Sequence, residues 1–301
     1  MNRRSFLLSS FTAALARAQR LSELQPDPHL TAGFAERDIS PELGMERPGN
    51  YGKVIHRRSF DPCKVRASVF GEGGARVAVV GLDALMIRRP VVQAARARIA
   101  SRCGIPPEAV MIAASHSHSS GPTGMVQPGE YDHASALVRR LAYEHSSCAD
   151  ADYLQRVESE IVNAVCAADA AREPALAGFG KGREAEVVFN RRFRMRNGLS
   201  YTHPRQGNPE MLEPAGPIDP EVGVLGVWTR HGVLTGCIVN FACHATAGPP
   251  GISANWIYWM ERVIQGAFGR QTVVVFTAGP NGDVTQVDNR SPHRLLGGTD
   301  S

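Results

Sequence analysis

The sequence predicts an α/β fold in which helices flank a mixed, largely buried β-sheet. Three apolar segments with the length of strands support this prediction, at 109–113, 233–241 and 272–276. Each of them runs into a polar or glycine-rich stretch, and helical spacing of apolar residues lies between them at 152–171 and 256–268. Functional residues of α/β proteins gather where strands open into loops. We therefore expect a functional site at these strand ends.

The first half of the sheet is expected to contain a crossover connection. A strand is predicted from Arg76 to Ile87, and Pro90 fits the first turn of a helix that runs to about Cys103. Pro106 and Pro107 then separate this helix from the strand at 109–113. The strand–helix–strand order is typical of parallel strands in a buried sheet.

The second half is expected to contain a hairpin and a core strand. Residues 222–228 and 233–241 read as its two strands around His231-Gly232. A helix at 256–268 and a β-branched strand at 272–276 follow. Two short strands are expected within 175–189, and long loops are expected at 123–150 and 198–220.

Composition excludes two classes of function. The chain has 301 residues, of which 43% are hydrophobic, and a formal net charge of +4. The basic residues are scattered, with no basic stripe interleaved with aromatic residues, so no nucleic-acid partner is expected. No apolar run approaches the roughly 20 residues of a membrane-spanning helix. The oligomeric state cannot be read from the sequence.

The N-terminus has the composition of an export signal. Arg3 and Arg4 precede an apolar stretch, and residues 16–18 (ARA) form a small-x-small cleavage site. We expect a twin-arginine-type signal peptide at 1–18, a linker at 19–30 and a catalytic domain at 31–301. The protein would then be periplasmic or secreted. The alternative is a short helix of the folded domain, and burial of residues 1–18 in the core would support it.

Six cysteines show no C-x-x-C spacing, so a thiolate zinc site is not expected. In an oxidising compartment some of them can form disulfides. Otherwise most are expected to be small buried apolar residues.

The most informative stretch is 115–122 (SHSHSSGP), which follows the apolar run 109–113. His116 and His118 are two residues apart, so on an extended chain both rings would point the same way, about 6–7 Å apart at their Cα atoms. Imidazole is a common zinc ligand, and the serine hydroxyls are expected to orient the rings. The alternative is a serine-rich loop with two solvated histidines.

Two further strand ends carry polar residues. His244 follows the strand 233–241 within the stretch 240–246 (NFACHAT), in a position that matches that of His116. The strand 272–276 ends in 278–283 (AGPNGD). We therefore predict that His116 and His244 share one metal ion, with ring nitrogens about 3–4 Å apart.

Several segments, taken together and in order, resemble motifs of the N-terminal catalytic region of the neutral/alkaline, non-lysosomal ceramidases and their bacterial relatives. The resemblance covers roughly residues 30–290. The segments are 33–41 (GFAERDISP), 115–122, 190–191 (NR), 219–225 (DPEVGVL), 240–246 and 282–285 (GDVT).

The resemblance implies a zinc-dependent hydrolase of the N-acyl bond of a lipid or small-molecule amide. Carried over by position, His116 and His244 would bind Zn²⁺. His118 and Arg191 would contact the reacting amide and its developing oxyanion, because a guanidinium stabilises negative charge.

The remaining candidate residues flank these positions. Asn190, Gly279 and Asn281 are expected to bind substrate, with Gly279 leaving space and Asn281 donating a hydrogen bond. Asp283 is expected to serve catalysis by orienting His116 or His118.

Two departures from the family pattern shape the expected mechanism. Gly279 stands where the resemblance places a nucleophilic serine, so attack by zinc-bound water is expected instead. The family's other zinc ligands, a Glu and a Tyr, would fall beyond Ser301, and the domain is therefore expected to be incomplete at its C-terminus.

Two alternatives stay open. An H-x-H metallohydrolase of the metallo-β-lactamase type would need an Asp at position 120, where Ser120 stands. An exported, non-catalytic binding domain of the same fold would explain Gly279.

Overall fold

The computed structural model describes residues 29–50 and 52–291. The expected signal peptide, most of the linker and the last ten residues lie outside the described residues. In the described part of the chain, no helix combines the length and the apolar character that crossing a membrane requires.

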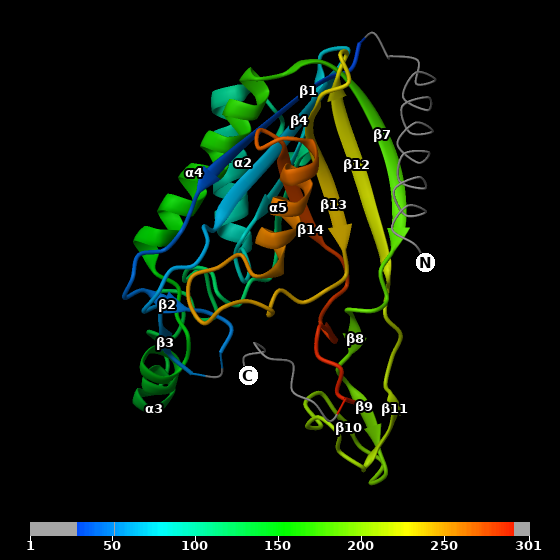
Figure 1. Cartoon of the computed structure of the whole chain (residues 1–301). Helices are drawn as coiled ribbons and strands as arrows, with labels where there is room; N and C mark the ends of the chain where they lie inside the picture. The colour runs from blue at the N-terminus through cyan, green and yellow to red at the C-terminus, as the bar shows by residue number, and fades with distance from the viewer. Residues whose placement is uncertain (1–28, 51, 292–301) are drawn as a thin grey trace, which may run out of the picture.

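An eight-stranded mixed sheet forms the centre of the molecule (Figure 1), which confirms the predicted fold class. Its strands, in spatial order, are β14 (Val273–Ala278), β13 (Leu234–Phe241), β12 (Glu221–Thr229), β7 (Glu173–Arg183), β1 (Thr31–Asp38), β4 (Lys64–Glu72), β5 (Ala75–Leu82) and β6 (Val110–Ala114).

Small sheets and helices complete the chain. The helices are α2 (Arg89–Cys103), α3 (Ala136–Arg140), α4 (Ala151–Ala170) and α5 (Trp256–Phe268), with a 3₁₀ turn at Pro107–Ala109 and a π-helical turn at Leu141–His145. The small sheets pair β2 (Glu46–Arg47) with β3 (Val54–Ile55), β8 (Phe189–Asn190) with β15 (Val284–Thr285), and β9 (Phe193–Met195) with β10 (Ser200–Tyr201) and β11 (Met211–Pro214).

Two pairs of neighbouring strands are parallel, β5 with β6 and β13 with β14, and every other pairing in the large sheet is antiparallel. The sheet curls so that its edge strand β14 packs against β4, β5 and β6. At this contact a Cβ atom on Gly81 would lie 2.3 Å from the main-chain oxygen of Phe276, so only glycine fits. The curl brings the loops that follow β6 and β13 together.

Helices α2 and α4 cover one part of the sheet, with α4 packed on β1 and β4 (Figure 1). Val157 and Ile161 of α4 and Val65 and Ala67 of β4 are fully buried in the same apolar cluster. Each of the buried valine and isoleucine side chains contributes about 1.5–3 kcal/mol when it leaves water. This packing makes the β4–β5–β6 part of the sheet a firm base for the loop after β6.

A buried ionic cluster ties α5 to the sheet. Arg66 on β4 contacts Asp83 at 2.7 Å and Glu261 on α5 at 2.5 Å, with all three side chains at most 2% exposed. Lys64 adds a second contact to Glu261 at 2.9 Å. The charges pair because a lone buried charge is very costly.

The crossover β5–α2–β6, the hairpin β12–β13 and the helices α4 and α5 agree with the sequence predictions. The expected loop 198–220 has little regular structure, as predicted, since it contains only the short strands β10 and β11. Two predictions were wrong. The expected loop 123–150 contains α3 and the π-helical turn. Residues 175–183 belong to one long strand, β7, because all of them pair with β12.

The cysteines divide into two groups. Cys103 at the end of α2 and Cys166 on α4 form a disulfide, with Cα atoms 5.7 Å apart. Cys63, Cys237 and Cys243 are buried and free, as expected, and Cys148 is free and partly exposed. The disulfide links α2 to α4, the two helices that cover the same part of the sheet.

Candidate metal centre

The loop after β6 turns sharply at His116. The strand ends at Ala114, and His116 adopts a left-handed conformation with φ of 62°. The chain is therefore not extended across His116, contrary to the expectation from strand alternation. The turn places the rings of His116 and His118 edge to face, with centroids 4.8 Å apart.

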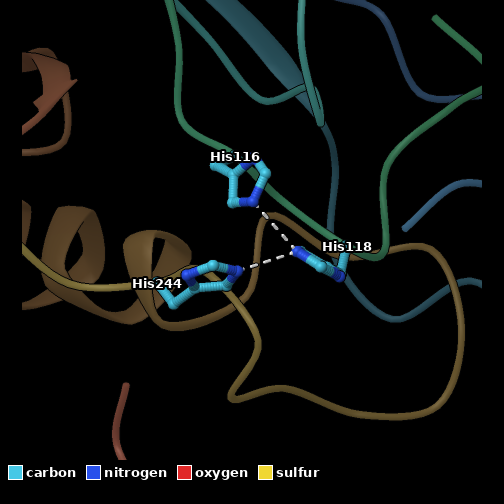
Figure 2. A group of neighbouring side chains, drawn as sticks. All are labelled: His116, His118 and His244. Carbon is cyan, nitrogen blue, oxygen red and sulfur yellow. Dashed lines mark hydrogen bonds between the residues drawn. The ribbon is translucent and has the colours of Figure 1, made fainter. Parts of the chain in front are cut away.

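His244 reaches the same point from the other end of the sheet. It follows β13, and its ring centroid lies 4.5 Å from that of His116 and 5.0 Å from that of His118. Figure 2 shows the three rings converging from two segments of the chain. His118 Nε2 lies 3.2 Å from His116 Nε2 and 3.1 Å from His244 Nε2.

Main-chain carbonyls orient all three rings. Each Nδ1 atom lies 2.8–2.9 Å from a carbonyl oxygen, and the pairs are His116 with Leu85, His118 with Gly49 and His244 with Asn281. A carbonyl only accepts hydrogen bonds, so each Nδ1 carries the hydrogen. In the neutral rings each Nε2 therefore has a free lone pair.

Three lone pairs thus face one another across contacts that lack a hydrogen. The contacts drawn as dashed lines in Figure 2 cannot be ordinary hydrogen bonds when all three rings are neutral. A shared cation removes this conflict. One ring nitrogen of each histidine lies within 4.8 Å of the others, and two zinc-bound nitrogens are about 3.3 Å apart for Zn–N bonds of about 2.05 Å.

The electrostatics favour the neutral, ligand-competent form of the rings. Burial lowers the pKa of all three histidines, to about 3 for His118 and to about 4 for His244. The charge of Arg191 lowers all three pKa values further, and the charges of neighbouring histidines lower those of His118 and His244. A metal ion would therefore not compete with protons near neutral pH.

The residues present fit a metal ion. Three histidines with an open fourth position are one of the ligand sets of catalytic zinc sites. Hydrogen bonds from Nδ1 to carbonyl oxygens are the usual second contact of metal-bound histidines. The cluster can therefore hold a metal ion, although the geometry does not select one metal.

The serine hydroxyls do not orient the rings, contrary to expectation. Ser117 Oγ donates to the carbonyl of Ser253 at 3.0 Å, and Ser120 Oγ donates to the carbonyl of Ser117 at 2.9 Å. Ser117 and Ser120 hold the backbone around this loop instead. The rings are oriented by the main-chain carbonyl groups that accept a hydrogen bond from each Nδ1 atom.

Arg191 acts on the cluster through its charge, which lowers the pKa of all three histidines. It follows β8, and its Nη2 donates to the carbonyl of Gly282 at 2.9 Å. This bond fixes the side chain beside the loop that also supplies a carbonyl to His244.

Asn190 and Asp283 bind each other rather than the histidines. Asn190 Nδ2 donates to Asp283 Oδ2 at 3.0 Å and to the carbonyl of Pro217 at 3.1 Å. Asn190 is buried, with its amide oxygen accepting from the main chain of Arg192. The expectation that Asp283 orients His116 or His118 was wrong, since carbonyls already occupy both Nδ1 atoms.

Gly279 and Asn281 also differ from their expected roles. A Cβ atom on Gly279 would lie 3.0 Å from Ala242 Cβ, so that side of the glycine is filled rather than open. Asn281 contacts His244 through its main-chain oxygen, while its amide donates to the carbonyl of Cys243 at 3.3 Å. Both residues shape the loop beside His244.

Sequence reasoning missed the residues that support His118. Gly49 has φ of 82°, and a Cβ atom there would lie 2.5 Å from His118 Nδ1. Arg47 Nε donates to the carbonyl of His118 at 3.1 Å. The Gly- and Pro-rich composition of 48–52 was visible in the sequence, but it did not indicate a contact with residue 118.

The fold and the cluster define an α/β protein with a three-histidine site at its strand ends, and solved structures show the same fold. The crystal structure of a neutral ceramidase from Pseudomonas aeruginosa matches with a TM-score of 0.66 and 24% sequence identity, over 91% of this chain and 42% of that one. A ceramidase complexed with C2 matches with a TM-score of 0.63 and 23% identity, over 86% of this chain and 39% of that one.

These similarities show a ceramidase-like fold, and the chain spans about two fifths of the length of those proteins. No protein-family profile matches the chain, and no curated protein matches its sequence.

Proposed function

We propose that this chain carries the zinc site of a hydrolase that cleaves N-acyl bonds of lipid amides, as its ceramidase structural neighbours suggest. The observation that supports the proposal most strongly is the convergence of three Nε2 lone pairs whose rings are each locked by a carbonyl. Three neutral imidazoles in this arrangement do not stabilise one another, because each presents a lone pair to the others. A divalent cation that binds all three nitrogens does stabilise the arrangement.

His116, His118 and His244 would hold the ion. When bound, zinc polarises a carbonyl group and lowers the pKa of water, which supplies the two activations that amide hydrolysis needs. His118 has the same tautomer as the other two rings, and one of its ring nitrogens lies within 4.8 Å of theirs. We therefore assign it as a third ligand rather than as a contact to the amide.

Arg191 is the residue that we assign to the developing negative charge of the substrate. Its guanidinium is held by Gly282 and acts electrostatically on the cluster. An arginine in that position stabilises an oxyanion without changing its own charge state. Loss of Arg191 should therefore lower kcat more than it raises KM.

The nucleophile that fits this loop is water. Gly279 has no hydroxyl, and Ala242 fills the space that a side chain there would need. The same observation favours a second candidate function, an exported binding domain of this fold that holds zinc without hydrolysing amides.

We also propose export to an oxidising compartment, with residues 1–18 as the signal. The disulfide between Cys103 and Cys166 supports this proposal, because such bonds are rare in reducing compartments.

One experiment separates the two functions. Zinc content is measured on the purified chain, and hydrolysis of a fluorescent N-acyl sphingoid amide is followed with and without a chelator. Stoichiometric zinc with chelator-sensitive hydrolysis supports the hydrolase, and zinc without hydrolysis supports the binding domain. If the purified chain contains no zinc, and His118→Ala hydrolyses the amide at the wild-type rate, the proposed metal site is refuted.

An acyl adduct on a serine during slow turnover, detected by mass spectrometry, would refute the assignment of water as the nucleophile.

A further inference from the structure

The start of α5 contacts both loops that carry the histidines. Asn255, the residue before α5, donates from Nδ2 to Ser117 Oγ at 2.6 Å, and Ser117 stands between His116 and His118. The next residue, Trp256, donates from Nε1 to the carbonyl of His244 at 3.1 Å. Two adjacent residues therefore bind both segments that form the cluster.

Asn255 is held in an unfavourable backbone conformation. It is 1% exposed, with φ of 61° and ψ of −147°, a region that glycine adopts and other residues avoid. Its side chain makes no capping hydrogen bond to α5, so helix capping does not explain an asparagine here. The amide is used on the histidine loop instead.

A closed set of hydrogen bonds fixes this conformation. Ser253 Oγ donates to Asp61 Oδ2 at 2.7 Å and accepts from the main chain of Asn255 at 2.9 Å. The main chain of Ala254 donates to Asp61 Oδ1 at 2.7 Å, and Ser117 Oγ donates to the carbonyl of Ser253. Asp61 thereby fixes the turn, and the turn fixes Ser117.

The helix behind the turn is itself anchored. Glu261, which lies on α5, joins this helix to β4 through ion pairs with Arg66 and Lys64. The ion pairs between α5 and β4 therefore fix the position of Asn255 relative to the central sheet.

We propose that Asn255 is a positioning residue of the histidine site. Through Ser117 it sets the relative placement of His116 and His118, and with Trp256 it fixes that pair against His244. This inference rests on the proposed metal function, because correct spacing of the three rings matters most when they share an ion. Contacts that orient metal ligands typically change metal affinity 10- to 100-fold.

Asn255→Gly provides the test, because it removes the amide and relieves the backbone strain at once. Zinc affinity is measured by competition with a chelating dye, and the coordination geometry is followed through the absorption bands of bound Co²⁺. We expect Kd for zinc to rise about 10- to 100-fold, with altered Co²⁺ bands and little change in Tm. Ser117→Ala should have a similar effect.

Ser68→Ala is the matched control. Ser68 is fully buried on β4, and its Oγ makes one bond, to the carbonyl of Val79 at 3.2 Å. Ser68 lies outside the histidine loops, so the Kd of the Ser68→Ala variant for zinc should stay within about twofold of the wild-type value.

Hydrogen exchange of the metal-free protein gives a second readout. In the described structure the amide of His118 donates to Ala245 and that of Ser119 to Ser117 Oγ. Asn255→Gly should speed exchange at these amides, and Ser68→Ala should not.

The outcomes are distinguishable. Unchanged zinc affinity and unchanged exchange in Asn255→Gly would overturn the positioning role, even if the variant were less stable. A wild-type protein that binds no zinc would instead overturn the proposed metal function, and the exchange data would still decide whether Asn255 positions the loop.

Discussion

Glu261→Gln should lower the free energy of unfolding by about 3 kcal/mol, at the low end of the range of about 3–5 kcal/mol for breaking a buried ion pair. Glu261 contacts Arg66 at 2.5 Å and Lys64 at 2.9 Å, and its side chain is 1% exposed. The low end applies because Arg66 keeps Asp83 at 2.7 Å and the new amide can still accept a hydrogen bond.

The pH dependence provides an internal check. Burial alone would raise the pKa of Glu261, but the charges of Arg66 and Lys64 outweigh it and hold the pKa below the usual value. A carboxylate with a depressed pKa stabilises the fold above its unfolded pKa of about 4.3 and loses that contribution as the pH falls. The difference between wild type and variant should therefore be largest near pH 7 and shrink below about pH 4.

Urea denaturation measures the effect, and Glu213→Gln is the control. The bridge between Glu213 and Arg194 is exposed, with side-chain exposures of 59% and 63%, and should contribute less than about 0.5 kcal/mol. Equal losses in the two variants, or a loss under about 1 kcal/mol for Glu261→Gln, would refute the reasoning.

Three further outcomes are expected. Because burial depresses the pKa of His118 to about 3 and that of His244 to about 4, the metal-free protein should lose stability as the pH falls from about 6.5 towards 4, and added zinc should reduce this loss in thermal melts. Gly279→Ala should destabilise by about 1–3 kcal/mol in urea, because its Cβ meets Ala242; a neutral result would show that the loop has room. Cys103→Ser should lower stability by about 2–4 kcal/mol through loss of the disulfide, and an unchanged Tm would contradict this.

The sequence predicted the fold class well because the signals were local. Apolar runs, the proline at the start of α2 and the spacing of α4 each depend on neighbours along the chain. The strands β10 and β11 were missed because they are short and pair only with β9, so no hydrophobic alternation marks them. The disulfide could not be assigned, since its cysteines are 63 residues apart.

The candidate metal ligands could be predicted from the sequence, but the residues that hold those ligands in place could not. His116 and His244 stood out because each follows an apolar strand, and the structure brings them together with His118. The carbonyl of Gly49 is 69 residues from His118, and Asn255 is 138 residues from Ser117. Such contacts depend on the curl of the sheet, which no local pattern encodes.

The carbonyl partners of the three rings have a consequence for how this site tolerates sequence change. An acceptor on the main chain is present whatever side chain the residue carries, so the hydrogen bonds that Leu85 and Asn281 accept from the rings do not depend directly on the identity of these two side chains. Gly49 is the exception, because any Cβ atom there would collide with His118. Substitutions can therefore accumulate around the cluster without disturbing its geometry, provided that the backbone path and this one glycine persist.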